Sequence, residues 1–144
     1  MRTFCKHFIL FLLGGLTYFI IEILWRGHSH WAMLLLGGIL FIEVGLVNEL
    51  LPWNMSLALQ GCIGGALITL SELAAGLLLN VGLGMDIWDY SNLPFQFMGQ
   101  ICLYYSIGWC FLSILIVIAD DYLRWFLFRE ERPRYRLFGC LILL

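Results

Sequence analysis

Charged residues are scarce in this chain, and their scarcity excludes most classes of soluble protein. Only 12% of the 144 residues are charged, 62% are apolar, and the mean hydropathy is +0.90. A soluble domain averages about 45–50% apolar and about 25% charged residues. The chain also lacks a basic face, because its arginines gather at one end, so nothing predicts nucleic-acid binding. These departures place the chain among polytopic membrane proteins.

The motifs of the common enzyme classes are also missing. No Ser-His-Asp, Cys-His, HExxH or P-loop pattern occurs, so the chain cannot itself be an ATPase subunit. The five cysteines have no metal-ligand spacing and are interpreted as free thiols. His28 and His30, with Asp86 or Asp89 across the same surface, form only a weak metal motif, and a solvated loop is the favoured interpretation. We therefore expect no metal and no cofactor.

Four apolar runs are long enough to cross a bilayer, which takes about 20 helical residues. They predict an all-α integral membrane protein with four transmembrane helices in an antiparallel bundle. The predicted spans cover about residues 7–25, 31–51, 55–80 and 94–119. Residues 1–128 would form a single transmembrane domain, and residues 129–144 a basic and then apolar C-terminal tail. The apolar end of this tail, residues 137–144, is too short to span and is expected at the lipid surface or in an oligomer contact.

Local signals support these boundaries. No small-x-small cleavage site follows the first run, so we expect an uncleaved span rather than a signal peptide. Pro52-Trp53-Asn54 predicts a tight turn that makes spans two and three antiparallel neighbours. Pro94 suits the first position of the fourth helix. The i,i+4 spacing of Asp120 and Arg124 favours continuation of that helix beyond the membrane.

The positive charges predict the orientation of the spans. With the N-terminus inside, the inner segments hold seven of the eight Lys and Arg residues, and the outer segments hold only Arg26. Lys and Arg accumulate in the cytoplasmic segments of membrane proteins. We therefore expect both termini in the cytoplasm.

Ionisable side chains inside the spans are candidate functional residues, because each costs about 2.5–3.5 kcal/mol near a helix centre. The helical rise places Glu22, Glu72 and Gln100 in the outer half of the membrane. Glu22 precedes Arg26 by four residues, which is the favourable order for an ion pair. The sequence thus predicts an outer polar cluster of Glu22, Arg26, Glu72 and Gln100, covered by the loop of residues 86–92. This loop contributes Asp89, Tyr90 and Ser91 to the predicted site.

Glu72 shares one ridge of its helix with small residues. Gly61, Gly65 and Gly76 lie on that ridge, and small residues four apart are typical of close helix packing. Glu72 is therefore expected to face protein rather than lipid.

Other spans carry further polar residues. Span four, as predicted, aligns Gln100 with Tyr104 and Gly108 on one face. In span two, Glu49 lies near the inner surface. Glu43 lies away from the small-residue face and marks either an oligomer contact or a protonated carboxyl group.

These residues resemble the ABC-transporter type IV (permease-like) family of small bacterial membrane proteins. That family has a glutamate late in the first span before an Arg-Gly, a later glutamate, then W-D-Y-S and Gly-[Arg/Gln]-Ile-Cys. The matching positions are Glu22, Arg26-Gly27, Glu72, Trp88 to Ser91 and Gly99 to Cys102. The resemblance covers about residues 18–124, although residues 28–36 replace a Gly-Pro and Pro-x-Tyr-Gly stretch.

The resemblance implies a multi-pass transporter component of the bacterial cytoplasmic membrane. Four spans are few for a transporter, so a homo-oligomer or another membrane subunit would complete it. One alternative is a structural or regulatory membrane partner, in which the polar cluster only holds helices together. A lipid-modifying enzyme using Glu72 or Asp89 as acid/base ranks last, because no nucleophile or metal set is evident. A water-filled cavity at Glu72 would favour a transporter or an enzyme. A Glu72 that is shielded from water and fully hydrogen-bonded would favour a structural or regulatory partner.

Overall fold

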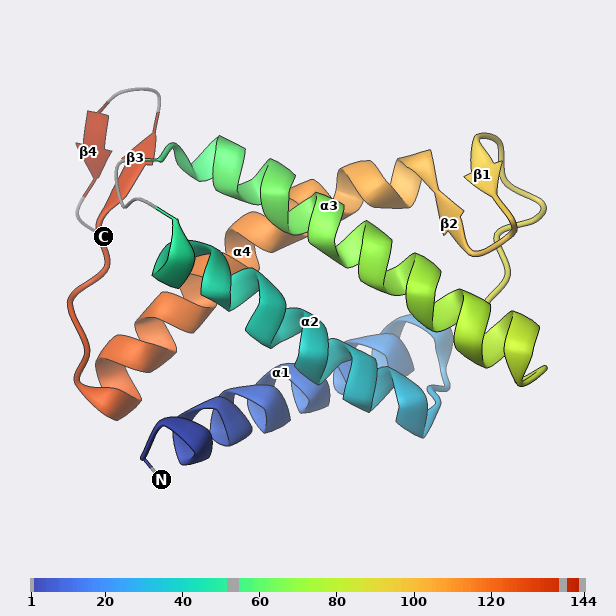
Figure 1. Cartoon of the computed structure of the whole chain (residues 1–144), viewed down its shortest axis with the longest axis horizontal. Helices are drawn as coiled ribbons and strands as arrows, with labels where there is room; N and C mark the ends of the chain where they lie inside the picture. Colours follow the sequence, from blue (N-terminus) through green and yellow to red (C-terminus); the bar gives the residue numbers. More distant parts are fainter. Residues whose placement is uncertain (1, 52–54, 138–139, 143–144) are drawn as a thin grey trace.

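A computed structural model describes residues 2–51, 55–137 and 140–142 of the chain (Figure 1). Four of its helices are long and apolar enough to cross a membrane, as predicted. They are α1 (Arg2–Arg26), α2 (Trp31–Leu50), α3 (Leu57–Gly76) with its continuation η1 (Leu77–Gly82), and α4 (Leu103–Phe128). The turn predicted at Pro52-Trp53-Asn54 lies outside the described residues.

Polar side chains begin two of these helices. The ring Nδ1 of His30 accepts a hydrogen bond from the Ala32 amide at 3.2 Å at the start of α2. The hydroxyl of Ser56 accepts from the Leu59 amide at 3.3 Å at the start of α3. Each cap satisfies an amide that has no partner within its own helix.

The fourth helix begins later than the sequence predicted, at Leu103 rather than Pro94. Residues 94–102 instead contain a short antiparallel hairpin in which β1 (Gln96–Phe97) pairs with β2 (Ile101–Cys102). Phe95 and Gly99 have φ angles of 57° and 67°, which a right-handed helix does not contain. The hairpin lies at one end of the molecule (Figure 1). Because Gln100 is not helical, its predicted alignment with span four is wrong.

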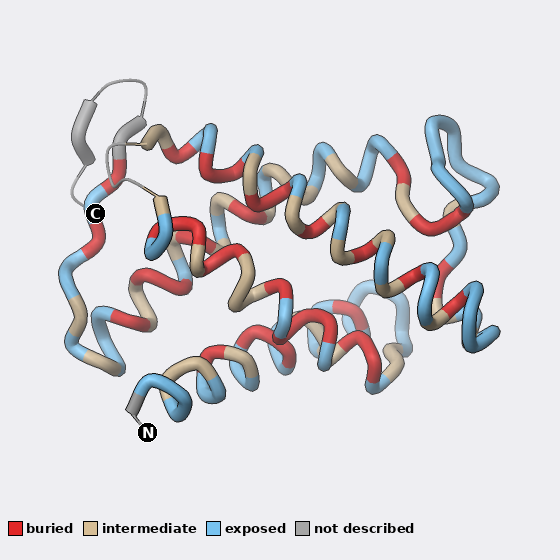
Figure 2. The backbone as a smooth tube through the Cα atoms, viewed as in Figure 1, coloured by how far each residue is buried: buried red, intermediate tan, exposed pale blue. Residues whose placement is uncertain are grey.

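The helices pack as two closely associated pairs, α1 with α2 and α3 with α4, and α1 and α4 contact each other little. Buried residues follow the faces that these helices turn toward one another (Figure 2). Val44, Ile68 and Val117 form part of the resulting core. The close pairing leaves a gap between α1 and α4, which is where the largest cavity discussed below lies.

The predicted tail folds back on the helices. The strands β3 (Tyr135–Leu137) and β4 (Cys140–Ile142) pair at the end of the molecule opposite the first hairpin (Figure 1). Tyr135 is only 2% exposed, and its hydroxyl donates to Asp121 of α4 at 2.8 Å. Tyr135, at the start of β3, therefore contacts the chain's own helices. Residues 138–139 and 143–144 lie outside the described residues.

Candidate functional site

Glu72 joins three segments of the chain. It lies in α3, is only 6% exposed, and accepts one hydrogen bond on each carboxylate oxygen. The hydroxyl of Tyr90 donates to Oε1 and the indole N–H of Trp109 donates to Oε2, both at 2.9 Å. Tyr90 comes from the loop before α4, and Trp109 from α4 itself. Charge-assisted bonds of this kind are stronger than neutral ones, so Glu72 positions both aromatic rings.

Tyr90 remains a hydrogen-bond donor in this site. Its burial and the neighbouring Glu72 carboxylate raise the pKa of the phenol well above its ordinary value. Its ring stacks on Tyr105 at 4.8 Å between centroids, and Tyr105 lies 6.3 Å from Trp109. Glu72 is thus covered by a continuous set of aromatic rings.

The loop that carries Tyr90 is held by amide side chains. Asn80, in the π-helical turn η1, accepts from the Ile87 amide at 2.8 Å and donates to the Trp88 carbonyl at 3.0 Å. Asn80 also donates to Oε1 of Gln100 at 2.9 Å. The indole N–H of Trp88 donates to the Gln100 carbonyl at 3.0 Å. Because π-helical turns often occur at functional sites, this turn supports the importance of the loop.

Asp89 and Ser91 form a separate, exposed turn beside Tyr90. The hydroxyl and the amide of Ser91 donate to Oδ1 of Asp89 at 2.6 and 2.8 Å. These bonds hold the pKa of Asp89 below its ordinary value. Gly99 packs against this turn, and a Cβ there would lie 2.6 Å from the Ser91 hydroxyl oxygen.

Glu22 and Arg26 form a second pair at the end of α1. Nη1 of Arg26 donates to Oε1 of Glu22 at 2.7 Å, and the Ser29 hydroxyl donates to Oε2. Nη2 of Arg26 donates to the Ile87 carbonyl at 3.3 Å. Arg26 therefore links α1 to the loop that covers Glu72.

A cavity of about 570 Å³ lies between α1, this loop and α4. We call it the aromatic cavity. Its lining consists of Tyr18, Ile21, Glu22, Trp25, Arg26, Trp88, Asp89, Tyr90, Asn92, Leu93, Tyr105, Trp109 and Leu112. Glu72 does not line it directly, but both of its hydrogen-bond donors do.

The predicted cluster is therefore divided in the structure. Glu22, Arg26, Asp89 and Tyr90 line the aromatic cavity, whereas Ser91 and Gln100 do not. Gln100 lies over Gly76, where an added Cβ would be 2.5 Å from its Oε1. Its side-chain bonds hold the loop rather than Glu72.

Sequence reasoning missed Asn80, Tyr105 and Trp109. Tyr105 and Trp109 are four residues apart, which places them on one helical face, and this spacing was a usable signal. It was overlooked because the face of span four was counted from Gln100, which lies outside the helix. Nothing local in the sequence identifies Asn80 as the residue that holds the loop.

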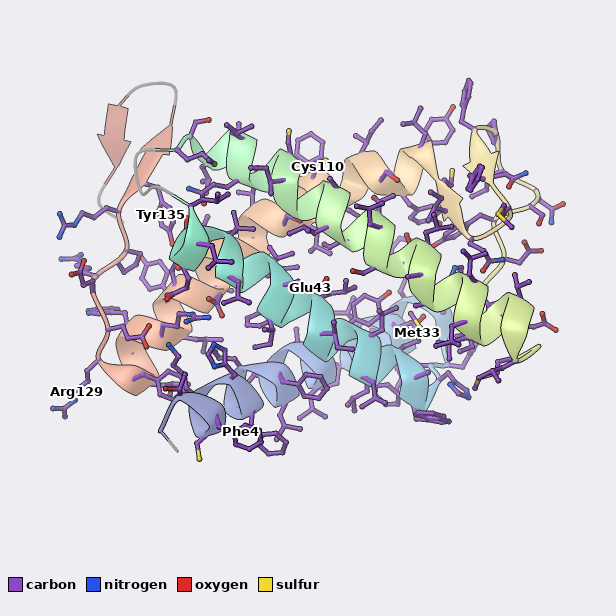
Figure 3. All side chains as sticks on the ribbon, in the orientation of Figure 1. Phe4, Met33, Glu43, Cys110, Arg129 and Tyr135 are labelled. Carbon is purple, nitrogen blue, oxygen red and sulfur yellow. The ribbon has the colours of Figure 1, made fainter. Side chains whose placement is uncertain are left out.

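The remaining glycines and carboxylates of the predicted set have other neighbours. A Cβ at Gly61 or Gly65 would meet α4 backbone atoms of Cys110 at 2.8 and 2.7 Å respectively. Glu43, which is labelled in Figure 3, accepts a hydrogen bond from Ser71 at 2.7 Å and so joins α2 to α3. It therefore has a partner within its own chain.

A second polar group lies near the ends of α2 and α4. Arg124 is 2% exposed, pairs with Asp120, and has Nη1 3.2 Å from Oε1 of Glu49. Arg124 lies in α4, which continues past Asp120 as the i,i+4 spacing of these two residues predicted. A 460 Å³ cavity lies beside it, bordered also by Asp121 and residues 129–131.

The histidines of the His28-Ser29-His30 motif form hydrogen bonds with nearby backbone groups. Nδ1 of His28 donates to the Arg26 carbonyl at 3.0 Å, while His30 caps α2. Among residues 2–51, 55–137 and 140–142, no group of three or more His, Cys, Asp or Glu side chains is arranged to hold a metal ion.

Four helices that are long and apolar enough to cross a membrane define a polytopic membrane protein. The model of the family described as Putative ABC-transporter type IV matches residues 9–143, and the chain belongs to this family. It is therefore a transporter-related membrane protein, as the motifs around Glu72 and Trp88 predicted. Neither the curated proteins nor the solved structures contain a match to the chain.

Proposed function

We propose that this protein is a permease-like component of a membrane transporter, and that its substrate path includes the aromatic cavity. The observation that carries this proposal is a buried intramembrane glutamate, Glu72, that accepts hydrogen bonds from Tyr90 and Trp109. Both of these residues line the 570 Å³ cavity. Intramembrane ionisable residues commonly mark substrate or ion pathways. Loss of both hydrogen-bonding oxygens at position 72 would release Tyr90 and Trp109 together and so alter the cavity.

The proposed arrangement in the membrane follows from the charges. The four helices would form an antiparallel bundle in the bacterial cytoplasmic membrane, with both termini in the cytoplasm. The aromatic cavity would then open in the outer half of the bilayer, and the Arg124 group would lie near the inner surface. Four spans are few for a substrate path, so a second copy or another membrane subunit would complete it.

A structural or regulatory membrane partner is the second candidate function. It is favoured by the pairing of both Glu72 oxygens and by the 6% exposure of that residue. In this case the glutamate would only fasten α3 to α4 and the loop. Interhelical hydrogen bonds of this kind contribute about 0.6 kcal/mol each in membranes.

Substitutions at Glu72 distinguish the two candidates. Glu72→Gln can still bond both neighbours, because its amide oxygen accepts from Trp109 and its amide N–H can donate to the Tyr90 oxygen. Glu72→Leu leaves both half-buried donors unpaired, and an unpaired donor costs up to about 1–3 kcal/mol when it is fully buried. We expect Glu72→Gln to fold normally but to abolish activity in a transport or complementation assay, and Glu72→Leu to lower thermal stability in detergent.

Glu43→Gln is the matched control, because Glu43 is also a span glutamate bonded to a neighbouring helix but does not border the aromatic cavity. It should retain activity. A fully active Glu72→Gln variant would contradict a transport role for the Glu72 carboxylate and support the interpretation that it only fastens the helices.

A further inference from the structure

The walls of the aromatic cavity indicate which ligands it fits. We propose that it binds a small hydrophobic organic cation, such as a quaternary ammonium or phosphonium ion. This inference rests on the proposed transport function, since it assigns a substrate class to the same site. It follows from the aromatic rings, the balance of charge and the apolar pocket beside the cavity.

Aromatic rings surround the cavity from three elements. Tyr18 comes from α1, Trp88 and Tyr90 from the loop, and Tyr105 and Trp109 from α4. The faces of such rings attract cations that carry little hydration, and quaternary ammonium ions are commonly held between several of them. Glu72 holds two of these rings in place from behind, so the walls are positioned before a ligand arrives.

The charges around the cavity favour a cation over an anion. Among the described residues, Arg26 is the only Lys or Arg in its lining, and its guanidinium is already bonded to Glu22 and to the Ile87 carbonyl. Asp89 borders the cavity, and no Lys or Arg ion pair to it is found among the described residues. Glu72 lies behind the aromatic wall, and its two hydrogen-bond donors among the described residues are both neutral. The carboxylates therefore outnumber the cationic groups.

An apolar pocket of about 260 Å³ lies beside the aromatic cavity. Tyr18, Ile21, Trp109 and Leu112 border both spaces, and the apolar pocket is otherwise lined mostly by aliphatic residues and glycine. These apolar surroundings suit a ligand with a hydrophobic body. A phospholipid fits less well, because its phosphate would face the carboxylates while the one guanidinium is already paired.

Two ions of similar shape and opposite charge test the proposal. Radiolabelled tetraphenylphosphonium and tetraphenylborate are equilibrated with the full-length protein in nanodiscs of phosphatidylcholine, and empty nanodiscs are subtracted. We expect saturable binding of tetraphenylphosphonium, and no saturable binding of tetraphenylborate. Equal saturable binding of both ions would show apolar partition without charge selection and would overturn the proposal.

Tyr105 supplies the most informative variant, because its ring lines the cavity and no hydrogen bond to Glu72 involves it. Tyr105→Leu should weaken tetraphenylphosphonium binding about tenfold, while Tyr105→Phe should retain it. Tyr104→Leu is the control, since Tyr104 is 58% exposed and lies outside the cavity. Equal losses in Tyr104→Leu and Tyr105→Leu would overturn the assignment of the site.

Charge is tested by Asp89→Asn, which should weaken cation binding several-fold, with Asp86→Asn as the control outside this cavity.

These binding assays separate the ligand class from the transport role. If tetraphenylphosphonium binds as expected while Glu72→Gln remains fully active, the role of the Glu72 carboxylate in transport fails and the binding site stands. If Glu72→Gln abolishes activity while tetraphenylphosphonium does not bind, the substrate class fails and the transport role stands.

Discussion

At the scale of single residues, three glutamates within the helices are compensated in different ways. Glu22 is paired with the guanidinium of Arg26, Glu43 accepts from the Ser71 hydroxyl, and Glu72 accepts from two aromatic donors. A buried polar group without partners is strongly unfavourable in a bilayer. The neutral, aromatic partners of Glu72 distinguish it from the salt-bridged Glu22, and they are the reason that we assign it the functional role.

The exposed turn at Asp89 allows a prediction about pH. The Ser91 hydroxyl and amide stabilise the ionised Asp89 carboxylate, so its pKa is lower in the folded loop than in an unfolded chain. The turn is therefore stabilised above the ordinary Asp pKa, and this contribution is lost as the pH falls through the lowered pKa.

Ser91→Ala removes the hydroxyl donor but keeps the amide. We expect the pKa of Asp89 to rise toward its ordinary value, measured by carboxyl ¹³C NMR of the labelled protein in detergent. Ser106→Ala is a suitable control, because the Ser106 hydroxyl donates to the Cys102 carbonyl instead. An unchanged Asp89 titration in Ser91→Ala would show that the hydroxyl bond does not control this carboxyl group.

At the scale of elements, α3 and α4 approach closely because glycine replaces bulkier residues on α3. A Cβ at Gly65 would lie 2.5 Å from Sγ and 2.7 Å from the backbone nitrogen of Cys110. The backbone cannot move aside as a flexible side chain can. Close approach through small residues is a common means of helix association in membranes, where the hydrophobic effect does not drive helices together.

Gly65→Ala should therefore destabilise the protein by about 1–3 kcal/mol, the usual cost of overpacking. Gly108→Ala is a matched control, because a Cβ at Gly108 on α4 would have nothing within 4 Å. Alanine there should be neutral or stabilising by up to about 1 kcal/mol. Denaturation in mixed detergent micelles measures both free energies of unfolding. Equal effects of the two substitutions would contradict the close contact at Gly65.

The hairpin of β1 and β2 is the element that sequence reasoning missed. Pro94 and the apolar residues after it suit a helix, so propensity alone favoured an earlier start for span four. In the structure the Tyr90 amide donates to the Gly99 carbonyl at 2.8 Å, and Trp88 donates to Gln100. The hairpin is therefore stabilised by the preceding loop, and tertiary contacts decide against the helix.

At the scale of the whole molecule, the proposed topology has a direct test. His28 lies between α1 and α2 and is exposed, whereas Ser29 donates to Glu22 and is a poorer site for a probe. In a variant lacking Cys5, Cys62, Cys102, Cys110 and Cys140, His28→Cys should react with an impermeant maleimide added to intact cells. Arg134→Cys, from the exposed part of the tail, should react only after the cells are opened.

Labelling of His28→Cys from the cytoplasmic side alone would reverse the assigned orientation. Such a result would place the aromatic cavity in the inner half of the bilayer. It would leave the contacts of Glu72 unchanged, because they do not depend on the direction of insertion.

The sequence by itself determined the features that depend on composition and on one helix at a time. Four apolar runs identify four potential spans, and the i,i+4 spacing places Glu22 beside Arg26, because helical geometry brings such residues together. Only the tertiary structure decided that Glu72 contacts Tyr90 and Trp109, which are 18 and 37 residues away in the chain. Their meeting depends on the hairpin before α4 and on the register of that helix, and no local periodicity encodes either one.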